Sequence, residues 1–262
     1  MHIRNLIKHY NFNGFLKLPG FYNETETRSI LKQSNNCLND KNIQVIRESD
    51  NVTIRSIMHY HHYNEILSQF SRDSRIIDIV ERLTGSPVYI SQSKINLKRG
   101  KKGKKWDYHR GFTFWHFLDG KPEPNMVSVF ICLSDQTIEN GAVYVLKESH
   151  KKTTLELLKN ESVVQNRNHH VEDTSSQLSI QIRKGFIEKY EKEYQKEYLL
   201  GKAGDVFFMH PNLLHASDKN IASNSRDLMI TVYNSIDNLP TKYSRPDYLC
   251  EPYTGALKPY QL

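Results

Sequence analysis

Residues 87–97 read Pro-Val-Tyr-Ile-Ser-Gln-Ser-Lys-Ile-Asn-Leu, and this stretch alternates as a β-strand does. Successive side chains of a strand point to opposite faces of a sheet. One face therefore carries Val88, Ile90, Gln92, Lys94 and Asn96. The segment predicts a strand that holds two amides, Gln92 and Asn96, on one side.

Four further segments have the composition of strands, and turn residues precede two of them. They are Met126–Leu133, Ala142–Leu146 after an Asn140-Gly141 turn, Asp205–Met209 after Gly204, and Arg226–Asn234. The chain shows neither strict alternation of strands with helices nor a repeat of solenoid length. A strand-rich middle and end with flanking helices predicts a mainly β fold, a jelly roll whose barrel-like interior commonly houses a metal.

Two helices are predicted before the first long strand. Asn23 and Glu26 have the spacing of a capping box, so we expect the first helix of the chain to begin near Glu24. Four apolar residues recur at helical spacing before Gly85 and predict a second helix near residues 73–84. They are Ile76, Ile77, Val80 and Leu83.

The composition is that of one globular domain spanning residues 1–262, since 38% of the residues are apolar and 25% are charged. The polar segment at about 151–202, with a helical tendency across Gly185–Tyr198, is interpreted as an insertion or lid within that domain. A mean hydropathy of −0.63 and the lack of a long apolar stretch exclude a membrane span. No secretory signal is visible, so we expect a cytoplasmic protein without membrane contact.

A net charge of +7 raises the question of an anionic partner. Only Lys98–Lys105 forms a dense basic run, and we interpret it as a solvated loop because no nucleic-acid-binding motif accompanies it. A nucleic-acid polymer is therefore not expected as a partner, although the run favours an anionic group near a cavity entrance. Cys37, Cys132 and Cys250 lie far apart in no metal-binding pattern, so they are expected to pack as small apolar residues.

Two histidines and an arginine form the candidate site. His109 lies in Trp106-Asp-Tyr-His-Arg-Gly-Phe-Thr-Phe-Trp115, and on an extended strand positions 109 and 111 point into the same cavity. His215 follows a predicted core strand, and Arg226 begins the next one. Taken alone, such histidines are more often hydrogen-bonded core or surface residues than metal ligands, and such an arginine is more often an ordinary ion-pair partner.

Together, these motifs resemble the phytanoyl-CoA dioxygenase superfamily, and most closely its ectoine hydroxylase-like members. The likeness covers nearly the whole chain. The matching segments are Asn13–Phe21, Gln92–Asn96, Trp115–Gly120, Asn140–Gly141, Glu148–His150, Gly204–Val206, His215–Ser217, Arg226 and Val232–Asn234. The resemblance implies a cupin-like double-stranded β-helix that binds Fe(II) through a His-x-Asp motif and a distal histidine, with 2-oxoglutarate as chelating co-substrate and O2 as oxidant.

His109 and His215 match the two histidines of that pattern, whereas Gly111 stands where it has an aspartate. Glycine offers no side-chain ligand, so the usual set of two histidines and one carboxylate is incomplete. Iron-dependent halogenases of the same superfamily resemble this arrangement, since they carry Gly or Ala there and a chloride or bromide ion fills the coordination position. The resemblance implies an oxidoreductase of biosynthesis, a halogenase that replaces an unactivated C–H hydrogen of a small molecule with chlorine or bromine by a radical mechanism.

The same resemblance assigns the remaining site residues. Arg226 pairs with the distal carboxylate of 2-oxoglutarate, Ser217 and Asn96 also contact 2-oxoglutarate, and Gln92 and Trp115 face the substrate. Two alternatives stay open: a hydroxylase that uses two histidine ligands, and an inactive binding relative in which Gly111 forms a bend or bulge. The substrate is open among a free amino acid, an alkaloid-like molecule, a nucleotide and an acyl group on a carrier protein, and the oligomeric state is open as well.

Two further groups of histidines are interpreted as solvated. His59, His61 and His62 form one group, and His169 with His170 forms the other. Neighbouring residues of a strand face opposite ways, and neither group has an evident partner ligand.

Overall fold

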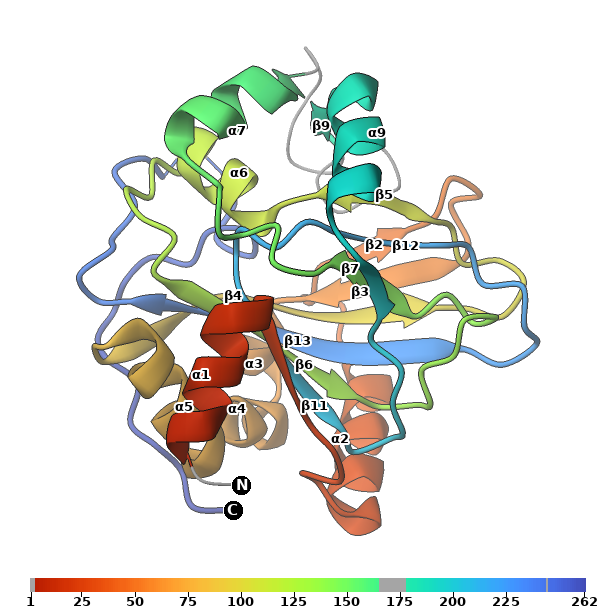
Figure 1. Cartoon of the computed structure of the whole chain (residues 1–262). Coiled ribbons are helices and arrows are strands. Elements are labelled where there is room, and N and C mark those ends of the chain that lie inside the picture. Colours follow the sequence, from red (N-terminus) through yellow and green to blue (C-terminus); the bar gives the residue numbers. More distant parts are fainter. Residues whose placement is uncertain (1–2, 165–177, 244) are drawn as a thin grey trace.

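The computed structural model describes residues 3–164, 178–243 and 245–262, and its centre is a pair of antiparallel sheets (Figure 1). The larger sheet has the strand order β1-β11-β6-β13-β4-β3-β2, and the smaller sheet has the order β10-β7-β12-β5. The larger sheet consists of β1 (Phe15–Leu18), β2 (Val45–Arg47), β3 (Ile54–Met58), β4 (Val88–Lys98), β6 (Met126–Cys132), β11 (Val206–Met209) and β13 (Arg226–Ser235). The smaller sheet consists of β5 (Trp106–His109), β7 (Val143–Leu146), β10 (Lys196–Tyr198) and β12 (His215–Ser217), and β8 (Ser162–Val164) pairs separately with β9 (Ile180–Ile182).

Helices lie on both sides of this pair of sheets (Figure 1). The larger sheet is covered on its outer face by α1 (Ile3–Asn13), α2 (Glu24–Cys37), α3 (Tyr60–Tyr63), α4 (Glu65–Ser71) and α5 (Ser74–Thr84). On the side of the smaller sheet lie α6 (Gly111–Phe117), α7 (Leu155–Glu161) and α9 (Lys184–Glu193). The largest apolar cluster joins the first group of helices to the larger sheet, for example through Ile30, Ile76 and Val129.

Strand β6 shows how one sequence serves both layers. Val129 and Ile131 pack with the helices in the largest apolar cluster, whereas Phe130 belongs to the cluster between the two sheets. All seven residues of β6 are buried, so the strand reads as a nearly unbroken apolar run. Ser128 is the polar exception, and it lines the cavity between the sheets.

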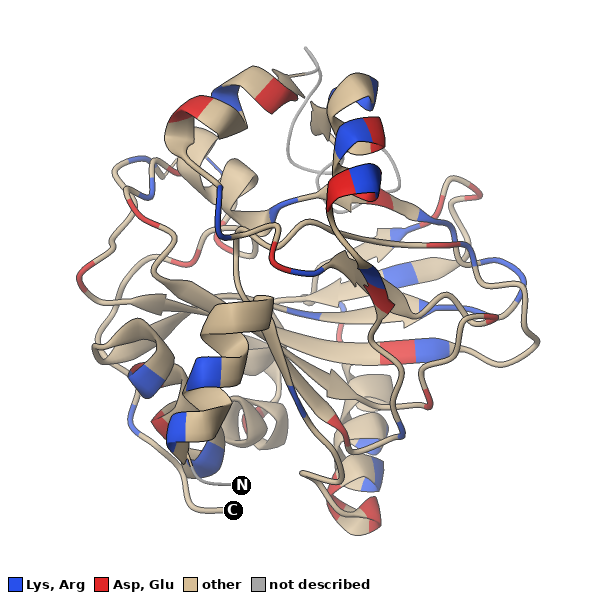
Figure 2. Ribbon diagram, viewed as in Figure 1, with Lys and Arg blue, Asp and Glu red and all other residues tan. Residues whose placement is uncertain are grey.

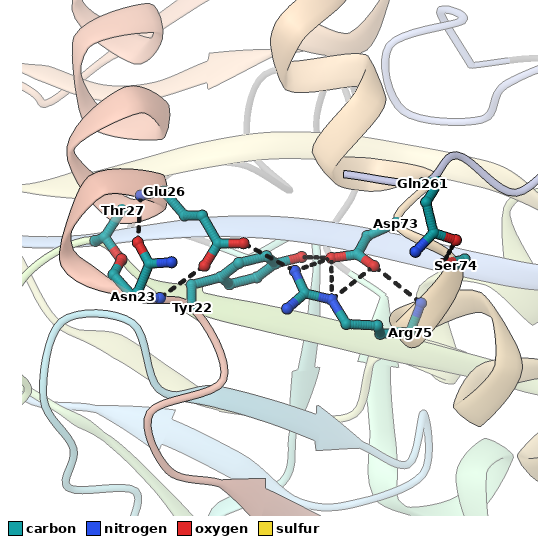
Figure 3. A network of polar contacts seen from close by, with 8 residues as sticks. All are labelled: Tyr22, Asn23, Glu26, Thr27, Asp73, Ser74, Arg75 and Gln261. Atoms are coloured by element: carbon teal, nitrogen blue, oxygen red, sulfur yellow. Dashed lines mark hydrogen bonds and ion pairs between the residues drawn. The ribbon is translucent and has the colours of Figure 1, made fainter.

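Both predicted helices are present, and their N-termini are linked by a polar network (Figure 3). Helix α2 begins with the predicted capping box, in which Asn23 accepts from the N–H of Glu26 and the Glu26 carboxylate accepts from the N–H of Asn23. Arg75, in the first turn of α5, bridges Glu26 and Asp73, the N-cap of α5. At the other end of α5, Gly85 has a φ of 74°, a left-handed conformation that glycine adopts without strain.

The predicted strands are all present as β4, β6, β7, β11 and β13, and the three cysteines are free and buried. The expectation that the first helix begins near Glu24 is wrong, because α1 precedes it. In α1 only Leu6 and Tyr10 bury large apolar side chains, which is too sparse a stripe to recognise in the sequence. Lys98 does not belong to a solvated loop either, since it ends β4 and is buried.

The polar segment at 151–202 forms, in its described part, α7, β8, β9, α9 and β10. Helix α9 covers only part of the predicted helical stretch, and Figure 2 shows charges of both signs gathered on it. Strand β10 pairs with β7 at one edge of the smaller sheet. The role of this segment as an insertion or lid stays a prediction. In the described ranges, every helix is too short or too polar to cross a membrane.

Candidate active site

The two candidate ligand histidines lie side by side on neighbouring strands of the smaller sheet. His109 is the last residue of β5, His215 is the first residue of β12, and the two are direct cross-strand partners. Their ring centroids are 4.2 Å apart. Because opposite residues of paired strands have Cβ atoms about 5 Å apart, strand pairing itself sets this proximity.

Backbone carbonyls fix the orientation of both rings. Nδ1 of His109 is 2.8 Å from the carbonyl oxygen of Asp107, and Nδ1 of His215 is 2.9 Å from that of Leu213. A carbonyl oxygen only accepts, so each Nδ1 carries the proton and each Nε2 keeps its lone pair for a metal. Desolvation lowers the pKa of His109 to about 4 and the pKa of His215 well below its usual range. Both imidazoles are therefore neutral at pH 7, the form that binds a metal.

Gly111 opens helix α6 and does not continue β5, so the expectation that His109 and Gly111 share one extended strand is wrong. Arg110 holds the turn between the two elements. Its buried guanidinium pairs with Glu161 at 2.8 Å and donates to two backbone carbonyls. Despite the change of element, His109 and Gly111 line the same cavity.

The indole of Trp115 lies over Gly111, one helical turn away. A Cβ added at Gly111 would lie 2.7 Å from Cη2 and 2.9 Å from Cζ3 of Trp115. The backbone at Gly111 is helical, so its conformation does not call for glycine, whereas the lack of space does. Any larger residue at this position, an aspartate included, requires the indole to move.

Seven of the eight predicted site residues line one cavity of about 90 Å³ between the sheets. They are Asn96, His109, Gly111, Trp115, His215, Ser217 and Arg226. The eighth, Gln92, lines an adjoining cavity of about 60 Å³ that shares His109, Gly111 and Trp115 with the first. The structure thus brings the set together, while the roles given to its members stay predictions.

Arg226, the first residue of β13, is a buried cation with unused hydrogen-bonding groups. Its side chain is 1% exposed, and its Nε and Nη1 have no hydrogen-bond partner among the residues that the structure describes. Burial lowers its pKa to about 10, so the guanidinium stays charged at pH 7. Burying a charge while two of its nitrogens lack hydrogen bonds is costly, so this guanidinium is suited to pair with an anion in the cavity.

Lys98 is a residue of this region that sequence reasoning missed. Its Nζ donates to Ser217 Oγ at 2.6 Å and to the carbonyl oxygens of Asp218 and Gly141. The alternation of β4 was the available signal, since Lys98 follows Asn96 by two positions and so shares its face. Burial lowers the pKa of Lys98 to about 5.

All charged side chains that line the two cavities in the described structure are cations, namely Lys94, Arg226 and Arg245. No carboxylate from these described residues faces either cavity. Arg245 is paired at 2.7 Å with Asp119, which lines neither cavity. The cavities therefore favour anionic ligands.

The phytanoyl-CoA dioxygenase (PhyH) family model matches residues 10–228. The chain belongs to the PhyH family. L-proline trans-4-hydroxylase from Streptomyces griseoviridis is 27% identical over 242 residues, which are 92% of this chain and 89% of the relative. Ectoine dioxygenase from Bordetella bronchiseptica is 29% identical over 259 residues, covering 93% of this chain and 80% of the relative.

The crystal structure of EctD from S. alaskensis with 2-oxoglutarate and 5-hydroxyectoine matches this PhyH chain with a TM-score of 0.83 at 24% identity. The match covers 100% of this chain and 88% of that one. It confirms the predicted fold, a double-stranded β-helix with flanking helices. Family membership places the protein, in its broad class, among the non-haem iron, 2-oxoglutarate-dependent dioxygenases.

Elsewhere in this PhyH chain, the interpretation of His59 and His61 as solvated is wrong. Their side chains are only 13% and 11% exposed, and together with His62 they surround Glu251. Glu251 lies far along the chain, so no local sequence pattern could reveal it as their partner. His169 and His170 lie outside the described residues.

Proposed function

We propose that this PhyH protein uses Fe(II) and 2-oxoglutarate to hydroxylate an aliphatic C–H bond of a small molecule that bears a carboxylate. One observation carries the proposal: a pair of neutral imidazoles with available Nε2 atoms shares a cavity with Arg226. Two nitrogens of that guanidinium lack hydrogen bonds within the described chain. A metal and a dicarboxylate would satisfy both groups at once.

His109 and His215 would hold the iron through Nε2. Arg226 would pair with the distal carboxylate of 2-oxoglutarate, because a guanidinium can bind a carboxylate bidentately. When bound, iron, 2-oxoglutarate and O2 supply the oxidising power that an unactivated C–H bond requires and that no side chain of the site provides. The protein's part is to position and enclose the reacting groups.

Two neighbouring side chains are already oriented for the same dicarboxylate. Ser217 Oγ accepts a hydrogen bond from Lys98, which leaves the Ser217 hydroxyl proton for an anion. Asn96 Oδ1 accepts from Ser56 Oγ at 2.8 Å, which leaves the Asn96 amide N–H groups for the cavity that Asn96 lines. Both residues therefore serve as donors to 2-oxoglutarate in this proposal.

The adjoining cavity is the proposed substrate site. Gln92 and Trp115 line it, and Lys94 and Arg245 add positive charge. A substrate carboxylate would be attracted to this charge, while its aliphatic part packs on the indole. The names of two relatives refer to L-proline and ectoine, which are small carboxylates, and this supports the proposed class.

Halogenation is the second candidate, and Gly111 is the observation that favours it. This position supplies no ligand, and no described carboxylate lines the cavities, so chloride or bromide could provide the anion. Two observations favour hydroxylation instead. The Trp115 indole covers the space beside Gly111, and the relatives compared above are a hydroxylase and a dioxygenase.

Anaerobic titration of the metal-free protein with Fe(II) and 2-oxoglutarate tests the site, in halide-free buffer and with chloride or bromide. We expect a visible charge-transfer absorption that develops without halide. An absorption that requires halide would favour the halogenase. If neither condition gives an absorption beyond that of His109→Ala/His215→Ala, the protein is an inactive binding relative and both enzyme functions are refuted.

Turnover with a panel of small carboxylates, including L-proline and ectoine, tests the reaction. Succinate release is followed together with the mass of the product. Hydroxylation makes the product heavier by one oxygen atom in every buffer. The isotope pattern of chlorine or bromine in the product would replace the first candidate with the second.

A further inference from the structure

A second group of ligand-type side chains lies outside the active site. One ring nitrogen from each of His59, His61 and His62 and a carboxylate oxygen of Glu251 all lie within 4.8 Å of one another. Nε2 of His62 is 2.6 Å from Oε1 of Glu251, Nε2 of His61 is 3.8 Å from Oε2, and Nε2 of His59 contacts Oε2. The Nε2 atoms of all three imidazoles therefore point toward the Glu251 carboxylate.

This cluster and the active site lie on opposite faces of β4. Nδ1 of His61 is 2.6 Å from the hydroxyl of Ser93, whose side chain is fully buried. The next residue, Lys94, lines both active-site cavities. Because adjacent side chains of a strand point to opposite faces, His61 approaches β4 from the side away from His109 and His215.

The local backbone gathers the three rings. His59 has a φ of 60°, in the left-handed region that non-glycine residues rarely adopt, and it is followed by the single helical turn of α3. An extended chain would turn His61 and His62 to opposite faces, whereas here their ring centroids are 4.4 Å apart. The backbone of Glu251 is held on β4, since its N–H donates to the carbonyl oxygen of Ser91 at 3.0 Å.

Within the described chain, the hydrogen bonds of the cluster leave Nε2 of His61 without a partner. The 3.8 Å between His61 Nε2 and Glu251 exceeds a hydrogen bond, and no described residue offers that nitrogen another partner. Zinc binds imidazole nitrogens and carboxylate oxygens at about 2.0–2.2 Å in a tetrahedron, which places the ligand atoms about 3.3 Å apart. The four ligand atoms, which lie within 4.8 Å of one another, are already near that spacing. The bond from His61 Nδ1 to Ser93 is the outer hydrogen bond that orients a metal-bound histidine.

We propose that His59, His61, His62 and Glu251 bind a structural zinc ion that fastens the C-terminal segment to the turn after β3. Three nitrogens and one oxygen complete a closed tetrahedral set. Leu249 and Arg245, just before Glu251, line the proposed substrate cavity. The ion would therefore hold one wall of that cavity in place. The site does not depend on the reaction proposed above, because it shares no ligand with it.

Zinc binding is measured in a His109→Ala/His215→Ala background, so that the active-site pair cannot contribute. Metal analysis by mass spectrometry after chelation and reconstitution should find one zinc per chain, and Co(II) should give the intense visible bands of tetrahedral coordination. Adding Glu251→Gln or His62→Gln should lower the zinc affinity at least about tenfold, and Ser93→Ala by roughly tenfold. If the background protein folds poorly, the same substitutions are compared in the otherwise unmodified chain. There the active-site pair and the proposed cluster can each bind zinc, and Glu251→Gln or His62→Gln should reduce two sites to one.

Two controls separate this site from non-specific binding by surface groups. His9→Gln and Glu123→Gln replace exposed residues outside the cluster and should leave the stoichiometry at one. Zinc should also slow amide hydrogen exchange across residues 245–262 in the background protein but not in its Glu251→Gln form. The site is overturned if the background protein binds no zinc. It is also overturned if the Glu251→Gln and His62→Gln proteins bind zinc as tightly as the background protein does. Binding without slower exchange overturns its role in fixing the segment.

Discussion

Replacing Gly111 with alanine should destabilise the protein only while Trp115 is present. The added Cβ would lie 2.7 Å from Cη2 of the indole, whereas carbon atoms in contact are ordinarily about 3.5–4.0 Å apart. The indole is 7% exposed and packs in a cluster with Phe112, Met126 and Leu158, so its movement disturbs the core. Overpacking of this kind costs about 1–3 kcal/mol, and replacing a helical glycine returns about 0.5–1 kcal/mol. We expect Gly111→Ala to lose about 1–2 kcal/mol of unfolding free energy.

Trp115→Phe removes the part of the indole that the added Cβ would meet, so it tests whether this clash causes the loss of stability. In that background Gly111→Ala should be neutral or stabilising by up to about 1 kcal/mol. Urea denaturation of the four proteins should therefore give an interaction energy of about 1–3 kcal/mol, or roughly 2–12 °C in melting temperature for a chain of this length. Effects that add within about 0.5 kcal/mol would refute the explanation that the indole excludes a side chain at Gly111.

Four further outcomes are expected. Arg226→Ala should weaken 2-oxoglutarate binding roughly 10- to 100-fold, as lost hydrogen bonds to a charged group do, and weaken substrate binding less; equal losses in calorimetry would contradict the assigned role. Lys98 has a folded-state pKa of about 5, far below its unfolded value, so between these two pH values the unfolded chain binds more protons than the folded protein. Wild-type protein therefore loses stability as the pH falls from about 10 to about 5. The unliganded Lys98→Met protein should gain stability relative to wild type over this range, as measured by urea titration. Burial alone would raise the pKa of Asp205, but hydrogen bonds from two backbone amides and a lysine lower it. Asp205→Asn should therefore cost about 2 kcal/mol of unfolding free energy at pH 7. The stability difference between wild type and Asp205→Asn should vanish as the pH falls through the folded-state pKa of Asp205. Gly111→Asp combined with Trp115→Phe should abolish any halide dependence of the product, because the carboxylate competes for the same iron position; undiminished halogenated product would count against this.

The main strands were predictable because their patterns are local. In β4, alternation places Gln92 and Asn96 on one face, and both residues line the cavities. The expectation that Val88 and Ile90 share that face is wrong, because a bulge in the pairing of β4 with β13 turns them into the largest apolar cluster. The capping box at Asn23 and Glu26 likewise fixed the start of α2, since its hydrogen bonds join residues three positions apart. Helix α1 has no comparable signal, because its stability comes from packing against the rest of the protein and not from a strong apolar stripe of its own.

The features that the sequence did not reveal depend on contacts between distant segments. The break between β5 and α6 is held by Arg110 and Glu161, which lie far apart in the chain. The hydrogen-bond partner of His59 and His62 is likewise distant, since Glu251 comes from the C-terminal segment. The steric reason for Gly111 is close in sequence, yet it depends on how Trp115 is packed, and a sequence motif carries no information about that packing.

The missing carboxylate and the cationic lining have a common consequence for ligand binding. No described side chain around the cavities brings negative charge, so the charge of a bound metal must be balanced by the ligands that accompany it. 2-Oxoglutarate would do this while also pairing with Arg226, two of whose buried nitrogens have no hydrogen-bond partner in the described chain. Binding of iron and 2-oxoglutarate should therefore be strongly and reciprocally coupled, each raising the affinity of the other by the same factor. Under either candidate function, the space beside the Trp115 indole would determine whether water or halide fills the remaining metal position, so this ring would matter as much as Gly111.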